Sequence, residues 1–130
     1  MNNQTRTLIQ QIIVLVIFFA AVALLINFAF NFIQPPEGQH YVTYRVRGNG
    51  GAAIISYTKT DGSSTGPLDV SLPWNSPRLT IPTNTTIILT AANPASLGTL
   101  ECIIELDGEE WRRDSTSNPG DRIACGGTVR

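Results

Sequence analysis

The sequence predicts an all-β sandwich of seven or eight short strands, preceded by one N-terminal transmembrane helix. Two observations predict this fold class: an uncharged apolar run near the N-terminus, and alternating apolar and polar residues in the rest of the chain. The 130 residues suit one small domain with one additional element. We expect a cytoplasmic N-terminus at residues 1–7, the transmembrane helix at 8–33, a linker at 34–40 and an extracytoplasmic domain at 41–130.

The apolar run is unbroken over residues 12–26, and no charged residue occurs from Thr7 to Pro36. Crossing the hydrocarbon core of a bilayer takes about 20 residues of helix, and the run with its flanks exceeds that length. Inside a bilayer the backbone has to satisfy its own hydrogen bonds, so the segment is predicted to be helical despite its many β-branched residues. The pair Pro35 and Pro36 ends the helix.

Few charges flank this segment, and they predict its orientation. Arg6 and the free amino group precede it, whereas Glu37 is the first charge after it. Positive charge favours the cytoplasmic side, so the domain is expected outside, at the cell membrane. A cleaved signal peptide is the alternative, because residues 21–23, Ala-Val-Ala, have the form of a cleavage site. The apolar run continues well beyond Ala23, which favours the uncleaved anchor.

Two amides interrupt the outer part of the helix. Asn27 and Asn31 stand four residues apart and therefore share one helix face. One interpretation is a polar seam that binds a partner helix in the membrane. The other is that both amides lie at headgroup level, a position that also suits the neighbouring phenylalanines.

Beyond the linker the pattern becomes that of half-buried strands. In residues 41–47, Val42, Tyr44 and Val46 share one face and alternate with polar side chains. Asp-Gly pairs at 61–62 and 107–108 are typical of hairpin turns. Strands are expected at residues 41–47, 53–58, 68–72, 78–81, 85–92, 100–107, 110–114 and 121–125.

The two cysteines are predicted to form a structural disulfide. Alternation places Cys102 on the inward face of one strand and Cys125 on the inward face of the last strand. A redox pair usually has the close spacing Cys-x-x-Cys, and a metal site needs more ligands than two cysteines and His40, the single histidine. An extracytoplasmic location permits the oxidation, and the bond is expected to stabilise the domain by about 3 kcal/mol.

The composition and motifs favour a binding role over a catalytic one. Nine basic and ten acidic residues are scattered without a basic face, which disfavours nucleic-acid binding. No nucleophile motif accompanies the single histidine, so we expect no enzymatic activity, no cofactor and no metal. Trp111, Arg112 and Arg113 follow the second hairpin turn, and Trp and Arg are the residues that dominate binding hot spots. They are the expected docking patch, although the sequence leaves open whether Trp111 faces the core.

The order of motifs resembles the mycobacterial small membrane protein (MmpS) family, the accessory partners of large resistance-nodulation-division exporters of lipids and siderophores. The similarity spans Tyr41 to Cys125, and its most specific pieces are a Leu-Pro-Trp strand end and the spacing from Cys102 to an Asp-Gly turn. The shared motifs are Tyr44-Arg45-Val46, Ser56-Tyr57, Asp61-Gly62, Val70-Ser71-Leu72-Pro73-Trp74, Leu79-Thr80-Ile81-Pro82 and Leu106-Asp107-Gly108-Glu109. The resemblance implies an immunoglobulin-like sandwich with one disulfide and a non-enzymatic role in export.

The expected function is therefore that of a membrane-anchored accessory or adaptor protein, bound to the bilayer through residues 8–33 and to an integral membrane partner. A structural single-pass subunit of another complex, respiratory or photosynthetic, is an alternative. A binding module for an extracytoplasmic ligand is another.

Overall fold

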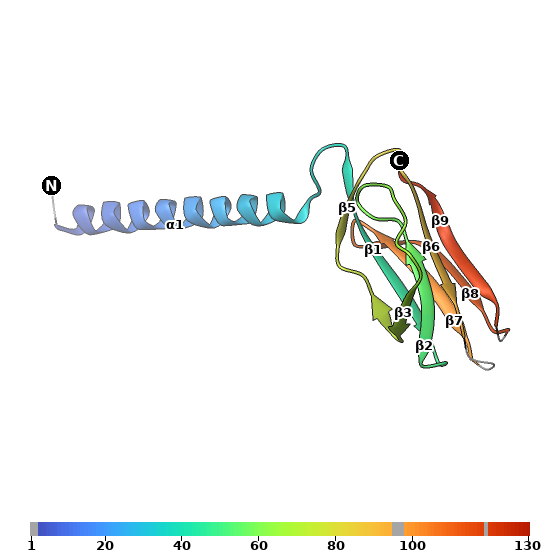
Figure 1. Cartoon of the computed structure of the whole chain (residues 1–130). Coiled ribbons are helices and arrows are strands. Elements are labelled where there is room, and N and C mark those ends of the chain that lie inside the picture. The colour runs from blue at the N-terminus through green and yellow to red at the C-terminus, as the bar shows by residue number, and fades with distance from the viewer. Residues whose placement is uncertain (1–2, 95–97, 119) are drawn as a thin grey trace. The chain divides into compact units, whose positions relative to one another are not determined.

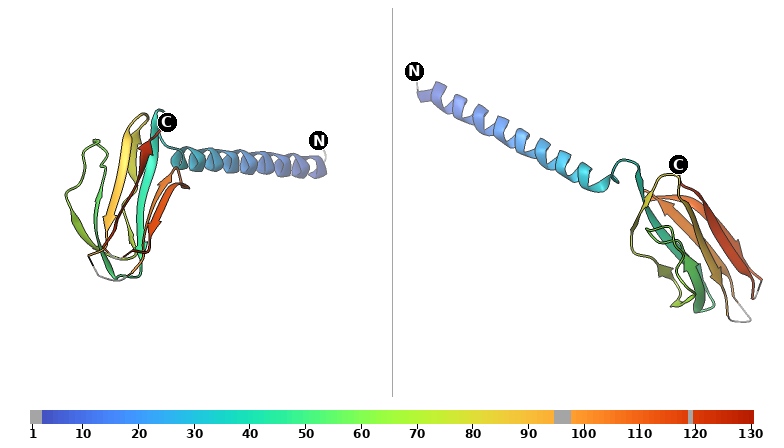
Figure 2. Two further views of the ribbon diagram at one scale, coloured as in Figure 1. Left: turned by 90° about the vertical axis from the view of Figure 1, so that its right-hand side faces the viewer. Right: turned by 45° about the horizontal axis from the view of Figure 1, so that its top comes forward.

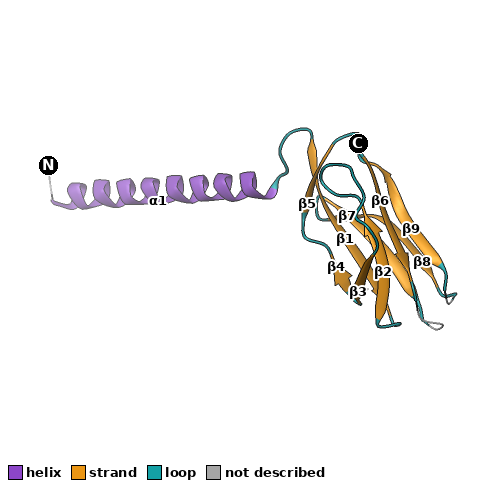
Figure 3. Cartoon of the chain, viewed as in Figure 1, coloured by secondary structure: helices purple, strands orange, loops and turns teal. Residues whose placement is uncertain are grey.

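The computed structural model describes residues 3–94, 98–118 and 120–130. The chain forms two compact units, Met1–Gln34 and Pro35–Arg130 (Figure 1). The first unit is helical and the second contains all the strands of the described residues (Figure 3).

A single helix, α1 (Asn3–Ile33), makes up the first unit. Its 31 residues span about 46 Å at 1.5 Å per residue, more than the roughly 30 Å hydrocarbon core of a bilayer. It is apolar and long enough to cross a membrane, a property that signal sequences near an N-terminus share. The helix ends at Ile33 as predicted, but it begins at Asn3 and not at Leu8, because the polar residues before the apolar run contain no helix breaker.

The second unit contains two antiparallel sheets. One has the order β4-β1-β7-β8, with β5 also paired to β1, and the other has the order β3-β2-β6-β9. The strands are β1 (Gln39–Gly48), β2 (Ala52–Tyr57), β3 (Leu68–Ser71), β4 (Trp74–Asn75), β5 (Leu79–Pro82), β6 (Thr86–Ala92), β7 (Leu100–Leu106), β8 (Glu109–Thr116) and β9 (Arg122–Thr128).

The described residues thus form nine strands, where seven or eight were expected. The additional one is β4, whose two residues are too few to show alternation in the sequence. It is held beside β1 by hydrogen bonds that join Ser76 and Tyr44, from Ser76 N–H to Tyr44 O at 2.9 Å and from Tyr44 N–H to Ser76 Oγ at 3.0 Å. The last strand extends to Thr128, three residues beyond its predicted end, because Gly126 and Gly127 continue the pairing without contributing side chains to the pattern.

The two sheets pack face to face around one hydrophobic core (Figure 2). Every predicted inward residue of the first strand is buried: Val42, Tyr44 and Val46. Cys102 on β7 and Cys125 on β9 form the predicted disulfide, which joins the sheets through the core. The buried cluster comprises Val42, Tyr44, Val46, Ala53, Ile55, Ile81, Ile87, Leu89, Ala91, Leu100, Cys102, Ile104, Ile123, Cys125 and Val129.

Tyr44 is the largest buried side chain, and its polar end is satisfied inside the core. Its hydroxyl donates to the Thr58 carbonyl oxygen at 2.9 Å. The ring lies 5.1 Å from Tyr57, which in turn lies 5.5 Å from Trp74, so the three aromatic rings form a stack at one side of the core. Burial raises the pKa of the Tyr44 phenol well above its ordinary value.

Candidate functional site

An irregularity in β8 determines where the predicted docking residues point. Opposite β7, Arg112 pairs with Ile104 and Glu110 pairs with Glu105, so Trp111 is one extra residue on β8. Successive side chains of a regular strand point to opposite faces, but a bulge of this kind breaks the alternation. Trp111 and Arg112 consequently lie on the same side of the sheet.

Both side chains reach across to β9 of the other sheet. A Cβ atom on Gly127 would lie 3.0 Å from Cη2 of Trp111 and 3.5 Å from Nε of Arg112. The indole is half-buried and packs against the hydrophobic core. The Arg112 guanidinium covers its ring at 4.3 Å from the centroid, and Arg112 Nη1 donates to the Trp111 carbonyl oxygen at 3.1 Å. Trp111 is therefore an edge residue of the core with Arg112 stacked on it.

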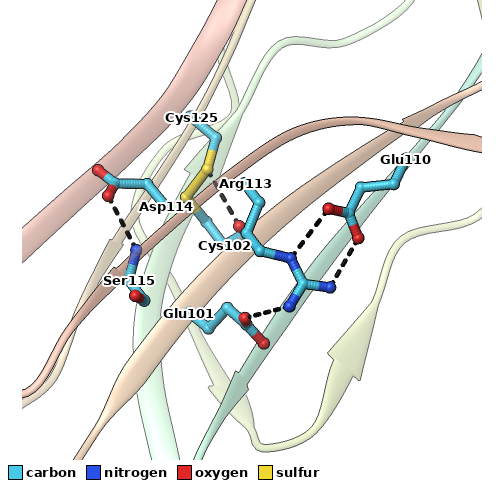
Figure 4. Close-up of polar contacts among 7 residues, drawn as sticks. All are labelled: Glu101, Cys102, Glu110, Arg113, Asp114, Ser115 and Cys125. Atoms are coloured by element: carbon cyan, nitrogen blue, oxygen red, sulfur yellow. Dashed lines mark hydrogen bonds and ion pairs between the residues drawn. A yellow bond between two sulfur atoms is a disulfide. The ribbon is translucent and has the colours of Figure 1, made fainter.

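Arg113 points to the opposite face of the sheet, away from Trp111. Its guanidinium binds both carboxylate oxygens of Glu110 at 2.6 and 3.0 Å and Oε1 of Glu101 at 2.7 Å (Figure 4). The hydrogen bonds from Arg113 lower the pKa of Glu110, and the same bonds raise the pKa of Arg113. The predicted patch is thus split, with Arg112 on one face and a charge-compensated Arg113 on the other.

The Arg113 network covers a buried apolar side chain that faces outward. Ile103 pairs with Arg45 on one side and Arg113 on the other, and only 2% of its surface is exposed. Arg45 is held in turn by Glu105 at 3.0 Å. The aliphatic parts of long charged side chains cover apolar surface in this way. On this outer face, which we call the charged face, the ion-paired side chains of Arg45 and Arg113 therefore cover Ile103.

The outer face of the second sheet is different. Its two central strands, β2 and β6, contain no charged residue, and we call their outer surface the uncharged face. Asp69 on β3, which pairs with Ile54, and Arg122 on β9, which pairs with Ala92, lie on either side of it. Ile54 and Ile88 are 38% and 48% exposed on it. The register places Ile54 beside Ala92 and Thr90 beside Ala124, so small and apolar side chains are continuous across the three strands. A shallow hollow of about 410 Å³ lies on it, lined by Ile54, Ser56, Pro67, Thr90, Ala92, Arg122 and Ala124 among others.

A second hollow, which we call the Trp111 hollow, has a volume of about 460 Å³. Its lining residues are Leu106, Trp111, Arg112, Thr128 and Arg130. Arg130 has no signal in the sequence, because it follows the last predicted strand and belongs to no motif. Its partnership with Arg112 depends on the bulge in β8, which also has no sequence signal.

The Trp111 hollow lies near the end of the domain at which the chain enters β1, which we call the linker end. Asn84 N–H donates to the Val129 carbonyl oxygen at 2.7 Å, and Thr83 N–H donates to the Gly38 carbonyl oxygen at 2.9 Å. Because Thr83 and Asn84 are consecutive, these bonds place the C-terminal segment beside the residue that precedes β1. Arg130, the next residue, therefore belongs to the linker end.

The single histidine also lies at the linker end and is part of a structural contact. His40 Nδ1 lies 2.6 Å from Oδ2 of Asp107, and the backbone N–H of Tyr41 donates to Oδ1 of the same carboxylate at 2.8 Å. Asp107 N–H donates to the Tyr41 carbonyl oxygen at 2.8 Å. These bonds fasten the start of β1 to the β7–β8 turn. In the described ranges no group of three or more His, Cys, Asp or Glu side chains is placed to hold a metal ion.

The two predicted amides of α1 differ in their surroundings. Asn27 Nδ2 donates to the Ala23 carbonyl oxygen of its own helix at 3.3 Å, which leaves its side-chain oxygen for another donor. Asn31 lies one turn further along the same face. The intrahelical bond shows that Asn27 is partly satisfied without a partner helix.

In comparisons with protein-family models and with curated protein sequences, no match to this chain is found.

Proposed function

We propose that the chain is a non-enzymatic accessory subunit of a membrane complex. Helix α1 anchors it with its N-terminus in the cytoplasm, and the two-sheet domain lies on the extracytoplasmic side. The length and exposed apolar surface of α1 support the anchor. The disulfide supports an oxidising compartment for the domain, since such bonds are rare in the cytosol.

The observation that carries the docking role is the contrast between the two outer faces of the domain. On the charged face, ion pairs hold the Arg45 and Arg113 side chains, which flank Ile103 and cover it. On the uncharged face, Ile54 and Ile88 stay exposed among small residues. Contiguous exposed apolar surface is typical of interaction sites. The occupant proposed for this face is an uncharged, apolar extracytoplasmic surface of an integral membrane protein held nearby in the same bilayer.

Within this proposal the two sheets form an immunoglobulin-like sandwich, and the partner is a large exporter of the resistance-nodulation-division type. The resemblance of the sequence to the MmpS family supports this class of partner. A respiratory or photosynthetic complex could bind the same apolar surface. Identification of the bound protein therefore distinguishes an exporter partner from such a complex.

Photo-crosslinking in native membranes tests the docking face. A benzoyl-phenylalanine at Ile88 is expected to form an adduct with an integral membrane protein, whereas the same residue at Arg47 on the charged face is expected to form none. Ile54→Asp in the Ile88-labelled chain should abolish the adduct, because a carboxylate in an apolar interface loses its hydration. Equal adducts at both positions, or an adduct that survives Ile54→Asp, would overturn the assignment of this face.

A second candidate function, that of a ligand-binding module, is favoured by the hollow on the uncharged face. Its apolar lining and the guanidinium of Arg122 suit an amphiphile with an acidic group. Native mass spectrometry of the full chain in detergent separates the candidates. A bound small molecule that is lost on Arg122→Gln supports the ligand, and its absence together with a protein adduct at Ile88 supports docking.

A further inference from the structure

We propose that the Trp111 hollow binds the headgroup phosphate of a phospholipid with net negative charge and thereby holds the linker end of the domain at the membrane surface. This inference rests on the proposed membrane anchor. It concerns residues at the β8–β9 edge of the domain and none of the residues that line the hollow on the uncharged face.

The lining of the Trp111 hollow is basic. Two guanidinium groups, those of Arg112 and Arg130, line the hollow, and no carboxylate side chain does. In the part of the chain that the structure describes, neither arginine makes an ion pair. Glu109 is close in sequence but is not among the lining residues. Guanidinium groups bind phosphate oxygens through paired, charge-assisted hydrogen bonds.

Arg112 is held in position before any ligand arrives. Its guanidinium lies on the Trp111 indole, and its Nη1 hydrogen bond to the Trp111 carbonyl fixes its direction. The indole is itself seated on Gly127, where a side chain would collide with it. A preorganised guanidinium loses less conformational entropy on binding an anion than a mobile one.

The tether between α1 and the linker end is short. Five residue steps separate Ile33, the last residue of α1, from Gly38. The Gly38 carbonyl accepts a hydrogen bond from Thr83, and the next residue, Asn84, is bonded to the C-terminal segment. A fully extended chain of this length spans at most about 18 Å. If α1 crosses the bilayer, the linker end is confined to the neighbourhood of the headgroups, where anionic lipid attracts basic side chains. Tryptophan and arginine are both suited to that layer.

Fluorescence quenching in lipid nanodiscs tests the site with the full chain. Trp74→Phe leaves Trp111 as the sole tryptophan, and the phenylalanine ring preserves the stack on Tyr57. All discs carry the same small fraction of a lipid with a nitroxide on its headgroup. The remaining lipid is either phosphatidylcholine alone or a mixture with phosphatidylglycerol.

The expected result is stronger quenching of Trp111 in the phosphatidylglycerol discs, with a loss of the difference at high salt. Arg112→Gln and Arg130→Gln should each lower, by about fivefold, the ratio of domains with the Trp111 hollow bound to a headgroup to domains with the hollow free. Arg47→Gln is the matched control, because Arg47 lies near the end of β1 away from the linker and also makes no ion pair in the described residues. It should leave the quenching unchanged.

Inorganic phosphate in phosphatidylcholine discs distinguishes a free anion from a lipid. Phosphate could shift the Trp111 emission while phosphatidylglycerol does not increase the quenching by the nitroxide lipid. That result would assign the hollow to a soluble phosphate and overturn the lipid assignment. Equal quenching in both lipids, or an equal effect of Arg47→Gln and Arg112→Gln, would also overturn it. Extraction of the chain from discs by alkali would contradict the anchor itself, whereas a retained chain without lipid-dependent quenching contradicts the headgroup site alone.

Discussion

The indole of Trp111 lies over Gly127 of β9, where the absence of a side chain leaves room for the ring. A Cβ atom at Gly127 would approach Cη2 of Trp111 to 3.0 Å. This pairing closes the gap between β8 and β9, the strands at the same edge of the two sheets. It also determines where Arg112 is presented, since the guanidinium lies on the indole.

Gly127→Ala is therefore expected to destabilise the domain by about 1–3 kcal/mol, because the indole has to move to accept the methyl group. Chemical denaturation of the full chain in detergent measures the change. Gly66→Ala is the control, since nothing lies within 4 Å of a Cβ atom there and its φ is not positive. Equal stabilities of the two variants would show that Trp111 is not seated on Gly127.

Removal of the disulfide by Cys102→Ala with Cys125→Ala is expected to cost about 2–5 kcal/mol, which is a large share of the stability of a small domain. The bond spans 23 residues and joins the two sheets. Thermal unfolding followed by circular dichroism measures the loss, and reduction of the wild-type chain should reproduce it. A double variant as stable as the wild type would contradict a structural role for the bond.

Ile103→Ala should cost about 2–5 kcal/mol, although Ile103 points to the outside of its sheet. Its side chain is 2% exposed because the Arg45 and Arg113 side chains flank it. Ile88→Ala is the matched control on the outer face of the other sheet, where 48% of the side chain is exposed and a small effect is expected. Similar costs for the two substitutions would mean that the ion pairs do not cover Ile103.

Tyr44→Phe should lower the stability at neutral pH by about 0.5–1.5 kcal/mol, since the hydrogen bond to the Thr58 carbonyl is lost. The phenol's pKa in the folded domain is raised above its ordinary value of 10.0. Above that pH the unfolded chain ionises while the folded chain does not, so the wild-type stability falls as the pH rises.

The Tyr44→Phe variant lacks that ionisation and should show a flatter stability profile above pH 10. Denaturation midpoints of both chains across the alkaline range give the comparison. Parallel profiles would contradict the burial of the Tyr44 hydroxyl.

Much of this fold can be predicted from short stretches of the sequence. Alternation located the long strands, and it placed Cys102 and Cys125 on inward faces that the structure joins. A continuous apolar run located α1 up to its last residue. These features depend on the identity of nearby residues, which a single sequence displays.

Features that depend on pairing between distant strands were not predictable. The bulge that turns Trp111 and Arg112 to one side, and Arg113 to the other, arises from the register of β7 and β8. The same holds for Ile103, whose burial depends on arginines from two neighbouring strands. The partner-binding roles of Asn27, Asn31 and the β8 side chains stay predictions.

The intact mass of the protein, measured after extraction from alkali-washed membranes of a bacterial host, tests the anchored and oxidised chain most directly. The proposal predicts the mass of residues 1–130 less two hydrogen atoms, because the helix is retained and Cys102 is bonded to Cys125. A chain that starts at Leu24, or a full-length chain with two free thiols, would contradict it.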